Sequence, residues 1–332
     1  MKFGLAQLTK GLFGNLQDRY REVVELRFGL VKAEPATLAA IGDKYGVTRE
    51  RIRQLEAIGL QELKKNLSHN EYAQFIKAVI GHLKGMGGVR KESDLLQDLR
   101  AFIKDEAKEP AVFDNQIRFL LSASSQVALH NEDREFYKFW YVSEDDVKKT
   151  KDFIVKLVKT LKNQKEASND YLSDLVSANY IGISKKFTVN AYGDFGLTEW
   201  PEIAPQNARD WAYLVLGKAK KPMHFLEIAT VVNKLRNKSS NPQTIHNELI
   251  KDDNFVLVGK GTYALKEHGY VPGVAWEVIT RLLKKHGPLH TDQVVDLVGQ
   301  ERLFKKNTII INLQNKNYFK RLEDGRYAVH EV

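Results

Sequence analysis

Polar side chains that can hydrogen-bond with bases are concentrated in the stretch GVTRERIRQLE, residues 46–56. Arg49, Glu50, Arg53 and Gln54 would share one side of a helix formed by this stretch. Arginine can bond guanine through two N–H groups, glutamine suits adenine, and glutamate can accept from the amino group of cytosine. The spacing therefore predicts a helix whose outer face reads base edges in DNA.

Apolar residues occupy the opposite side of the same helix. Ile52 and Leu55 lie there, and Thr48 precedes the helix as an N-cap, since its hydroxyl can accept a hydrogen bond from a first-turn N–H group. A solvated charged face is the simpler interpretation of this pattern. It would not, however, require the tight Gly-Val turn that stands in front of the helix.

The segment TLAAIGDKYG, residues 37–46, predicts a shorter helix directly upstream. Thr37 is its expected N-cap, Leu38 and Ile41 face inward, and Gly46 ends it at a position where φ is expected to be positive. Two helices joined by such a turn form a helix-turn-helix, in which the second helix enters the major groove of DNA.

The segments REVVELRFGL (21–30) and TLAAIGDKYGVTRERIRQLEAIGLQELKK (37–65) together resemble region 4 of bacterial primary sigma factors. The resemblance implies that the region binds the minus-35 promoter element and docks on the flap of RNA polymerase. It assigns base and phosphate contacts to the outer face of the second helix, whereas Arg51 would support the helix or touch the DNA backbone. The DNA-contacting residues expected in this module are Thr37, Lys44, Thr48, Arg49, Glu50, Arg51, Arg53 and Gln54.

The position of the matching segment departs from the sigma pattern. A working sigma factor also needs a domain that melts the minus-10 element, upstream of region 4, whereas here the match begins near residue 1. We therefore expect residues 1–66 to form a sigma-like helix-turn-helix module in a protein that is not a complete sigma factor.

An internal repeat occupies the C-terminal part of the chain. Pro222 is matched by Pro288, 66 residues later, and Thr244 is matched by Thr308, 64 residues later. Each copy predicts three helices and a two-stranded hairpin with a glycine turn, which is the pattern of a winged helix. The expected helices are 208–219, 224–234 and 242–251 in the first copy and 273–286, 290–298 and 305–315 in the second.

The first copy, residues 206–267, resembles the HARE-type winged helix found in the delta subunit of bacterial RNA polymerase. The stretches KPMHFLEIA and HNELIKDDNFVLVGKGTYAL carry the match. Modules of this family bind DNA in some settings and proteins in others. In the hairpins, Lys260, Lys320 and Arg326 are candidate phosphate contacts, with solvated wing tips as the alternative.

Two weaker copies precede this pair. We expect a winged helix at 70–142, a degenerate winged helix at 144–203, the HARE-type module at 206–267 and a last winged helix at 270–332. The third helix of the 70–142 copy is placed at 115–124. For the 144–203 copy the expected core is Phe187, Phe195, Leu197 and Trp200. The predicted fold is thus mainly α with small β-wings, a helix-turn-helix followed by tandem winged-helix modules.

The charge is distributed unevenly along the chain. Lys and Arg outnumber Asp and Glu by 12 to 8 in residues 1–66 and by 20 to 13 in residues 206–332, whereas the remainder holds 19 against 21. The net charge of the whole chain is +9. Basic ends around a near-neutral middle suggest separate modules that face a polyanion.

The composition and motifs disfavour several classes of protein. The chain has no Cys, no apolar run long enough to span a membrane and no recognisable signal peptide, so we expect a cytoplasmic protein without disulfides. It has no HExxH, Walker or GxSxG motif. His224 and His290 each stand alone in their copy, so a helix-start or packing role is favoured over a metal pair. We predict no enzymatic activity, no cofactor and no metal.

Two functions of different classes remain. The first is a sequence-specific DNA-binding transcription regulator, in which the sigma-like helix reads promoter-type double-stranded DNA and the winged helices extend the contact. The second is an RNA polymerase accessory factor, delta-like or sigma-competing, that acts on the polymerase core through protein contacts. A shift of free duplex DNA by the purified protein would separate the two.

Overall fold

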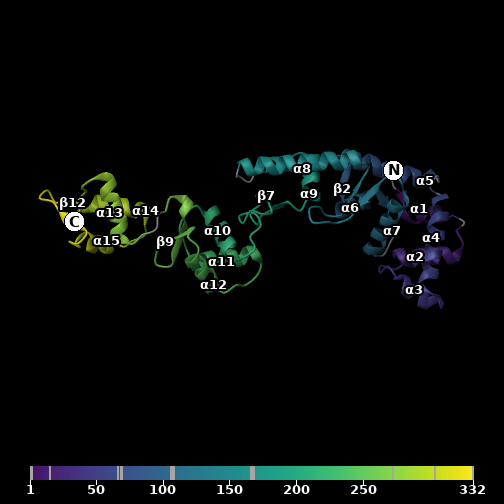
Figure 1. The fold of residues 1–332 in the computed structure, drawn as a ribbon, viewed down its shortest axis with the longest axis horizontal. Helices are drawn as coiled ribbons and strands as arrows, with labels where there is room; N and C mark the ends of the chain where they lie inside the picture. Colours follow the sequence, from purple (N-terminus) through teal and green to yellow (C-terminus); the bar gives the residue numbers. More distant parts are fainter. Residues whose placement is uncertain are drawn as a thin grey trace. The chain divides into compact units, whose positions relative to one another are not determined.

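The computed structural model describes residues 3–14, 16–65, 67, 70–104, 109–164, 169–270, 273–302 and 304–330. Its contacts divide the chain into two compact units, one of residues 1–188 with 195–197 and one of residues 189–194 with 198–332 (Figure 1).

The first unit begins with a helical core that contains the predicted helix pair. Helices α2 (Asp18–Phe28), α3 (Leu38–Tyr45) and α4 (Arg49–Lys65) contact one another. Val23, Ile41, Ile52 and Leu55 are buried between them. The predicted inward positions of both helices of the pair are therefore confirmed for Ile41, Ile52 and Leu55, while Leu38 is partly buried at the edge of this core.

A second core in the same unit has the element order expected for the 70–142 copy. It contains α5 (Asn70–Gly85), β2 (Val89–Lys91), α6 (Glu92–Phe102), α7 (Pro110–Ala123), β4 (Ala128–His130) and β5 (Phe139–Tyr141). The three strands form an antiparallel sheet in the order β2-β5-β4. The third helix begins at Pro110, earlier than the predicted start at residue 115, because proline is well suited to the first turn of a helix.

The N-terminal helix packs in this second core. Helix α1 (Leu5–Phe13) buries Leu8, Leu12 and Phe13 against residues of α5 and α7. The short strand β1 (Phe3–Gly4) pairs in parallel with β3 (Ile103–Lys104). Residues 3–13 were expected to belong with the 1–66 module, and their apolar side chains instead help to close the core of the following segment.

The next elements also pack onto this core. They are α8 (Glu144–Gln164), a 3₁₀ turn η1 (Asp170–Leu172), α9 (Leu175–Ile183), β6 (Phe187–Val189) and β7 (Phe195–Leu197). Helix α9 lies against β2, and the buried Asn179 side chain donates to the carbonyls of Met86 and Val89 at 2.7 Å each. The segment 144–183 is therefore attached to the 70–142 segment by the tertiary contacts of α9, in addition to the continuous backbone.

The strands β6 and β7 pair with each other and supply the apolar residues expected for the 144–203 segment. Phe187, Phe195 and Leu197 are buried, as predicted. Trp200 was placed in the same core and is only partly buried, because it stands in a turn just after β7.

The second unit contains the two copies of the internal repeat. The first copy comprises α10 (Ala208–Ala219), β8 (Met223–His224), α11 (Phe225–Arg236), α12 (Pro242–Lys251), β9 (Phe255–Gly259) and β10 (Thr262–Leu265), followed by a 3₁₀ turn η2 (Lys266–His268). Its antiparallel sheet has the order β8-β10-β9, which matches the order β2-β5-β4 of the earlier copy. The helices agree with the predicted ranges within two residues.

The second copy repeats this order. It comprises α13 (Ala275–His286), α14 (Thr291–Glu301), α15 (Lys306–Leu313), β11 (Phe319–Arg321) and β12 (Tyr327–Val329). A bridge between Leu289 and Tyr327 stands where β8 pairs with β10 in the first copy. The buried Arg302 guanidinium joins the copies by donating to the carbonyls of Leu257 and Gly273.

Within the described parts of the chain, none of the helices combines the length and the apolar composition that crossing a bilayer requires.

Candidate nucleic-acid interface

The turn between α3 and α4 fixes the direction of the candidate reading helix. Gly46 has φ of 65°, in the left-handed region, and the Val47 N–H donates to the Gly42 carbonyl at 2.9 Å. A Cβ atom on Gly42 would stand 2.6 Å from the Val47 carbonyl oxygen. Glycine is therefore required at both positions, once for backbone conformation and once for the close approach of the turn.

Threonine side chains cap both helices of the pair. The Thr37 hydroxyl accepts from the Ala40 N–H at 3.1 Å, and the Thr48 hydroxyl accepts from the Arg51 N–H at 3.2 Å. Both predicted N-caps are confirmed. Because these hydroxyls satisfy first-turn N–H groups, the N-terminal turn of α4 is formed in the free protein.

The outer face of α4 is open to solvent. Thr48 and the following polar residues are all exposed, whereas Ile52, Leu55 and Gly59 on the other side are buried. The exposed polar residues of this face are Arg49, Glu50, Arg51, Arg53 and Gln54. The helix thus separates the residues that hold it in place from those that can meet a ligand.

Ion pairing organises this face along the helix. The Arg53 guanidinium donates to both Glu50 carboxylate oxygens, with Nε 3.0 Å from each and Nη2 2.7 Å from one. The hydrogen bond lowers the pKa of the Glu50 carboxyl and raises the pKa of Arg53. Arg51 donates from Nη1 to the Gln54 side-chain carbonyl at 3.1 Å.

The pairing has a consequence for recognition. Glu50 and Arg53 are presented as one hydrogen-bonded unit, with a carboxylate acceptor and guanidinium donors on neighbouring turns. Three arginines against one glutamate leave an excess of positive charge on this face. Such a face offers both base-edge and phosphate partners.

Lys44 lies at the C-terminal end of α3 and is also exposed. Its ammonium group is 3.3 Å from the Tyr45 hydroxyl, which in turn is hydrogen-bonded to Glu22 of α2. The lysine therefore stands beside the turn, where its charge can act on a phosphate near the start of α4.

The wing residues are placed less uniformly. Lys260 is exposed in the turn of the β9–β10 hairpin, and Lys320 is exposed on β11. Arg326 is instead paired with Asp324, Nη2 to Oδ2 at 2.6 Å, in the turn before β12. A hydrogen bond from Arg326 accordingly lowers the pKa of Asp324. Arg326 is therefore less available to a ligand than the two lysines.

Histidines 224 and 290 occupy equivalent helix starts, at the N-caps of α11 and α14. The His224 ring accepts from the Leu226 N–H at 3.4 Å, and the His290 N–H donates to the Gln293 side chain at 2.9 Å. The predicted helix-start position is confirmed for both histidines, and the ring of His224 takes part in the cap. Among the residues that the structure describes, no three His, Asp or Glu side chains are grouped as a metal site would require.

The third helix of the 70–142 copy has almost no free surface. Of the side chains on α7, only Pro110, Ala111 and Ser122 are exposed. Helices α1, α2 and α4 contact it, and Asn115 and Gln116 donate to backbone carbonyls of the 29–33 loop. In a winged helix bound to DNA this helix would lie in the groove, so this copy cannot use it in that way.

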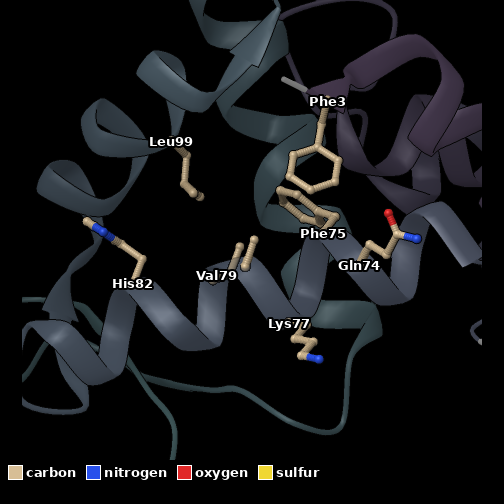
Figure 2. A pocket seen from close by; sticks show the side chains of 8 residues that line it. Phe3, Gln74, Phe75, Lys77, Val79, His82 and Leu99 are labelled. Atoms are coloured by element: carbon tan, nitrogen blue, oxygen red, sulfur yellow. The ribbon is translucent and has the colours of Figure 1, made fainter. Parts of the chain in front are cut away.

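A separate apolar cavity of about 620 Å³ lies between α5, α6 and β1. Figure 2 shows Phe3 beside Phe75, with Val79 and Leu99 facing the same space. At its edge the His82 ring is 2.8 Å from the Asp98 carboxylate, which Arg90 also holds. His82 belongs to this ion-pair network, and Gln74 and Lys77 are the other polar residues among the described ones that line the cavity.

Comparison with known proteins places the candidate interface in a defined family domain. Residues 12–65 match the profile described as Sigma-70, region 4. The matched range begins within α1 and includes α2, α3 and α4, and therefore the turn and the exposed polar face of α4. Residues 12–65 are a sigma-70 region 4 domain.

Three curated relatives align with short parts of the chain. RNA polymerase sigma factor RpoS of Coxiella burnetii is 53% identical over 49 residues, 15% of this chain and 14% of that protein. RNA polymerase principal sigma factor HrdD of Streptomyces griseus is 43% identical over 54 residues, 16% of each chain. RNA polymerase sigma-C factor of a Nostoc species is 33% identical over 79 residues, 24% of this chain and 19% of the relative. The chain thus spans less than a fifth of each of these relatives.

The sequence predicted the exposed polar face of α4 but not the residues that orient the helix. The Glu50–Arg53 pair has a signal in its i, i+3 spacing, which is favourable for an ion pair on a helix. Asn115 and Gln116, which hold the region 4 domain to α7, had no such signal, because their partners are backbone carbonyls 82 to 86 residues away.

Proposed function

We propose that this chain is a sequence-specific DNA-binding transcription regulator whose region 4 domain reads promoter-type duplex DNA in the major groove. The observation that carries the proposal is the exposed face of α4, with Arg49, Glu50, Arg53 and Gln54 held in order on a capped helix. A base-reading helix needs this combination of groups, because guanine, adenine and cytosine edges differ in their donors and acceptors.

We further propose that the segments 70–142, 206–267 and 270–332 are winged-helix modules. Their shared order of elements supports this. Each has three helices followed by a hairpin, and one hairpin strand pairs with a short segment between the first and second helices. Of the three, the two in the second unit keep their third helices accessible. They, and not the 70–142 module, would extend the contact with DNA.

The charge distribution supports this division. The region 4 module and the C-terminal pair carry net charges of +4 and +7, from 12 against 8 and 20 against 13 charged residues, whereas the middle carries −2, from 19 against 21. Duplex DNA attracts the first two and not the third. Several modules on one duplex would add their binding free energies, less the cost of restraining the linkers.

A selection of bound sequences from random duplexes, using the full chain, tests this function. We expect an enriched sequence whose affinity falls steeply with salt, since each phosphate contact adds roughly one unit to the salt slope. Substituting Arg49 and Arg53 by alanine together should abolish enrichment of the bases that α4 contacts. A full chain that shifts no duplex at low salt, although folded, would exclude the proposal.

A second candidate function is an RNA polymerase accessory factor that acts through protein contacts. Two observations favour it. The matched relatives are RNA polymerase sigma factors, and the middle of the chain is near-neutral, with α7, the third helix of the 70–142 segment, covered by other helices. Capture of core polymerase by the full chain, relieved by an added sigma factor, would support it. Capture in the absence of any duplex binding would favour it over direct DNA reading.

Either role would place the protein in the cytoplasm without an enzymatic activity or a cofactor of its own. These remain predictions. An assay of the purified chain for nuclease and nucleotide hydrolysis would test the enzymatic part.

A further inference from the structure

The third helix of the first repeat copy, α12, has an outer face of unusual composition. Gln243, Asn247 and Ile250 follow one another at i, i+4 and i+7, so they form one line along the helix. All three are exposed, and Ile250 is 64% exposed. The Gln243 amide nitrogen is 3.2 Å from the Asn247 side-chain oxygen, which aligns the two carboxamides.

The third helix of the second copy, α15, presents the same groups in another order. Asn307, Ile311 and Gln314 form the corresponding line, each 64 residues after its counterpart in α12. All three are exposed, and Ile311 is 66% exposed. Each helix therefore offers two carboxamides and one isoleucine on its outer line.

The fold does not account for these isoleucines. The inner line of α12 already buries Ile245 and Leu249, and the inner line of α15 buries Ile309 and Leu313. An isoleucine left in water forgoes roughly 1.5–3 kcal/mol that burial would provide. Each of the two equivalent helices therefore has an exposed isoleucine on its outer line that is available to a ligand with apolar groups.

The charges around these helices indicate what kind of ligand that is. No Asp or Glu occurs between residues 302 and 322, and Lys306 is the cation there that reaches a carboxylate, Asp292, at 3.4 Å. The other cations around α15 and β11 are exposed: Lys305, Lys316, Lys320 and Arg321. Around α12 the charge is mixed: Lys238 and Lys260 are exposed, whereas Lys251 pairs with Glu248 at 3.5 Å and Asp252 and Asp253 follow the helix. The α15 face therefore carries the excess of positive charge, which suits a polyanion and disfavours an apolar protein partner.

Duplex DNA rich in A·T base pairs combines these properties. Adenine offers N6 and N7 to the two bonds of a side-chain carboxamide, and thymine offers its C5-methyl group to an apolar side chain. We propose that α12 and α15 are reading helices for A·T base pairs in the major groove, with Ile250 and Ile311 against thymine methyl groups. The inference rests on the proposed DNA-binding function and names the sequence class that the C-terminal pair prefers.

The preference contrasts with that of α4. Its outer face carries three arginines and one glutamate, whose favoured partners are guanine and cytosine. The chain would thus read two kinds of sequence with two parts, and the α12 and α15 faces would contribute nothing on a G·C duplex beyond phosphate contacts.

Replacement of thymine by uracil tests the proposal, because it removes only the C5-methyl group. The probe is an alternating A·T duplex, its uracil counterpart, and a G·C duplex of equal length, with the full chain in a fluorescence anisotropy titration at fixed salt. Wild-type protein should bind the thymine duplex about fourfold more tightly for each contacted methyl group. The Ile250→Ala, Ile311→Ala double variant should lose this discrimination.

The control is Val155→Ala, because Val155 is 63% exposed on α8 in the other unit and lies outside the proposed face. It should keep the discrimination between thymine and uracil. Thermal unfolding of the double variant should match wild type, since both isoleucines are exposed.

Three results have distinct meanings. The inference would be overturned if wild type bound the thymine and uracil duplexes equally, or if the double variant kept the discrimination. Either result would also be expected if the isoleucines contact a protein partner and not DNA. If the inference fails but duplex binding persists and depends on Arg53, the proposed DNA-binding function still holds. Absence of binding to every duplex at low salt would remove both.

Discussion

The Asn115 side-chain amide donates a hydrogen bond to the backbone carbonyl of Gly29 at 3.2 Å, and a second one to the Ala33 carbonyl at 3.0 Å. Gly29 ends α2 with φ of 64°, and a Cβ atom there would stand 2.6 Å from the Asn115 amide nitrogen. The loop after α2 and the covered helix α7 are therefore complementary. This contact holds the region 4 domain in a fixed orientation on the second core of its unit.

Removal of the Asn115 amide should loosen this junction. We expect Asn115→Ala to lower the free energy of unfolding by about 1–2 kcal/mol, because two hydrogen bonds to partly buried carbonyls are lost. Amide hydrogen exchange should increase in residues 29–36 more than in α5. Asn163→Ala, at an exposed asparagine of α8, is the matched control and should change neither quantity. Equal exchange in both variants would mean that the contact does not hold the domain.

The Arg53 guanidinium should contribute to sequence preference. Arg53→Ala is expected to cost about 1–3 kcal/mol on the best selected duplex and to relax the preference at one position. The control is Arg134→Ala, an exposed arginine in the connection between β4 and β5. Competition binding with selected and random duplexes measures both. A loss of the same size on random DNA would assign Arg53 to a phosphate and not to a base.

The wing lysines should act on all sequences alike. Lys320→Ala should weaken binding to selected and random duplexes by the same factor and reduce the salt slope by about one unit, as expected for a phosphate contact. Arg326→Ala should have a smaller effect, because Asp324 already holds its guanidinium. Affinities measured across a salt series give both slopes. A larger effect at Arg326 than at Lys320 would contradict the placement of these side chains.

The stability of the first unit should depend on pH through Asp98. Burial raises the pKa of this carboxyl, but hydrogen bonds from Arg90 and His82 outweigh it, and the pKa lies below its ordinary value of 3.8. A carboxyl whose pKa is lowered by folding stabilises the protein above the unfolded-state value, and this contribution is lost as the pH falls through the folded-state pKa.

Asp98→Asn should therefore be less stable than wild type at pH 7, by roughly 1.5–3 kcal/mol, the usual cost of losing a charged hydrogen bond. The difference should shrink as the pH falls below 3.8. Denaturant unfolding at several pH values measures it, with Asp152→Asn at an exposed site within α8 as the control. A difference that stays constant with pH would show that the carboxylate charge is not the cause.

Asn179 should be essential for the docking of α9 on β2. Its amide donates to Met86 and Val89 and accepts from Arg90, and the residue is 4% exposed. Asn179→Ala leaves these groups without their partners and should cost about 2–3 kcal/mol, whereas Ser177→Ala on the same helix should cost less. Thermal unfolding of the full chain measures the loss. A neutral Asn179→Ala would imply that α8 and α9 are stable without the preceding segment.

Local sequence determined the helix-turn-helix and the face that it presents. Thr37, Gly46 and Thr48 act on neighbours within four residues, so their capping and turn roles can be read from types and spacing. The same holds for the repeat helices, in which Ile245 and Leu249 have the period of a buried helical line. The resemblance to sigma region 4 depended on this local pattern, and the matched range 12–65 contains it.

Tertiary structure decided which of these helices is accessible. The third helices of the three copies look alike as sequence patterns, yet α7 is covered whereas α12 and α15 are open. Helices α1 and α4 cover α7 from positions about 50 to 110 residues earlier in the chain, and such long-range packing leaves no periodic signal. Local sequence therefore determines which side chains lie on the outer face of each helix. Long-range packing determines whether that face is accessible to a ligand.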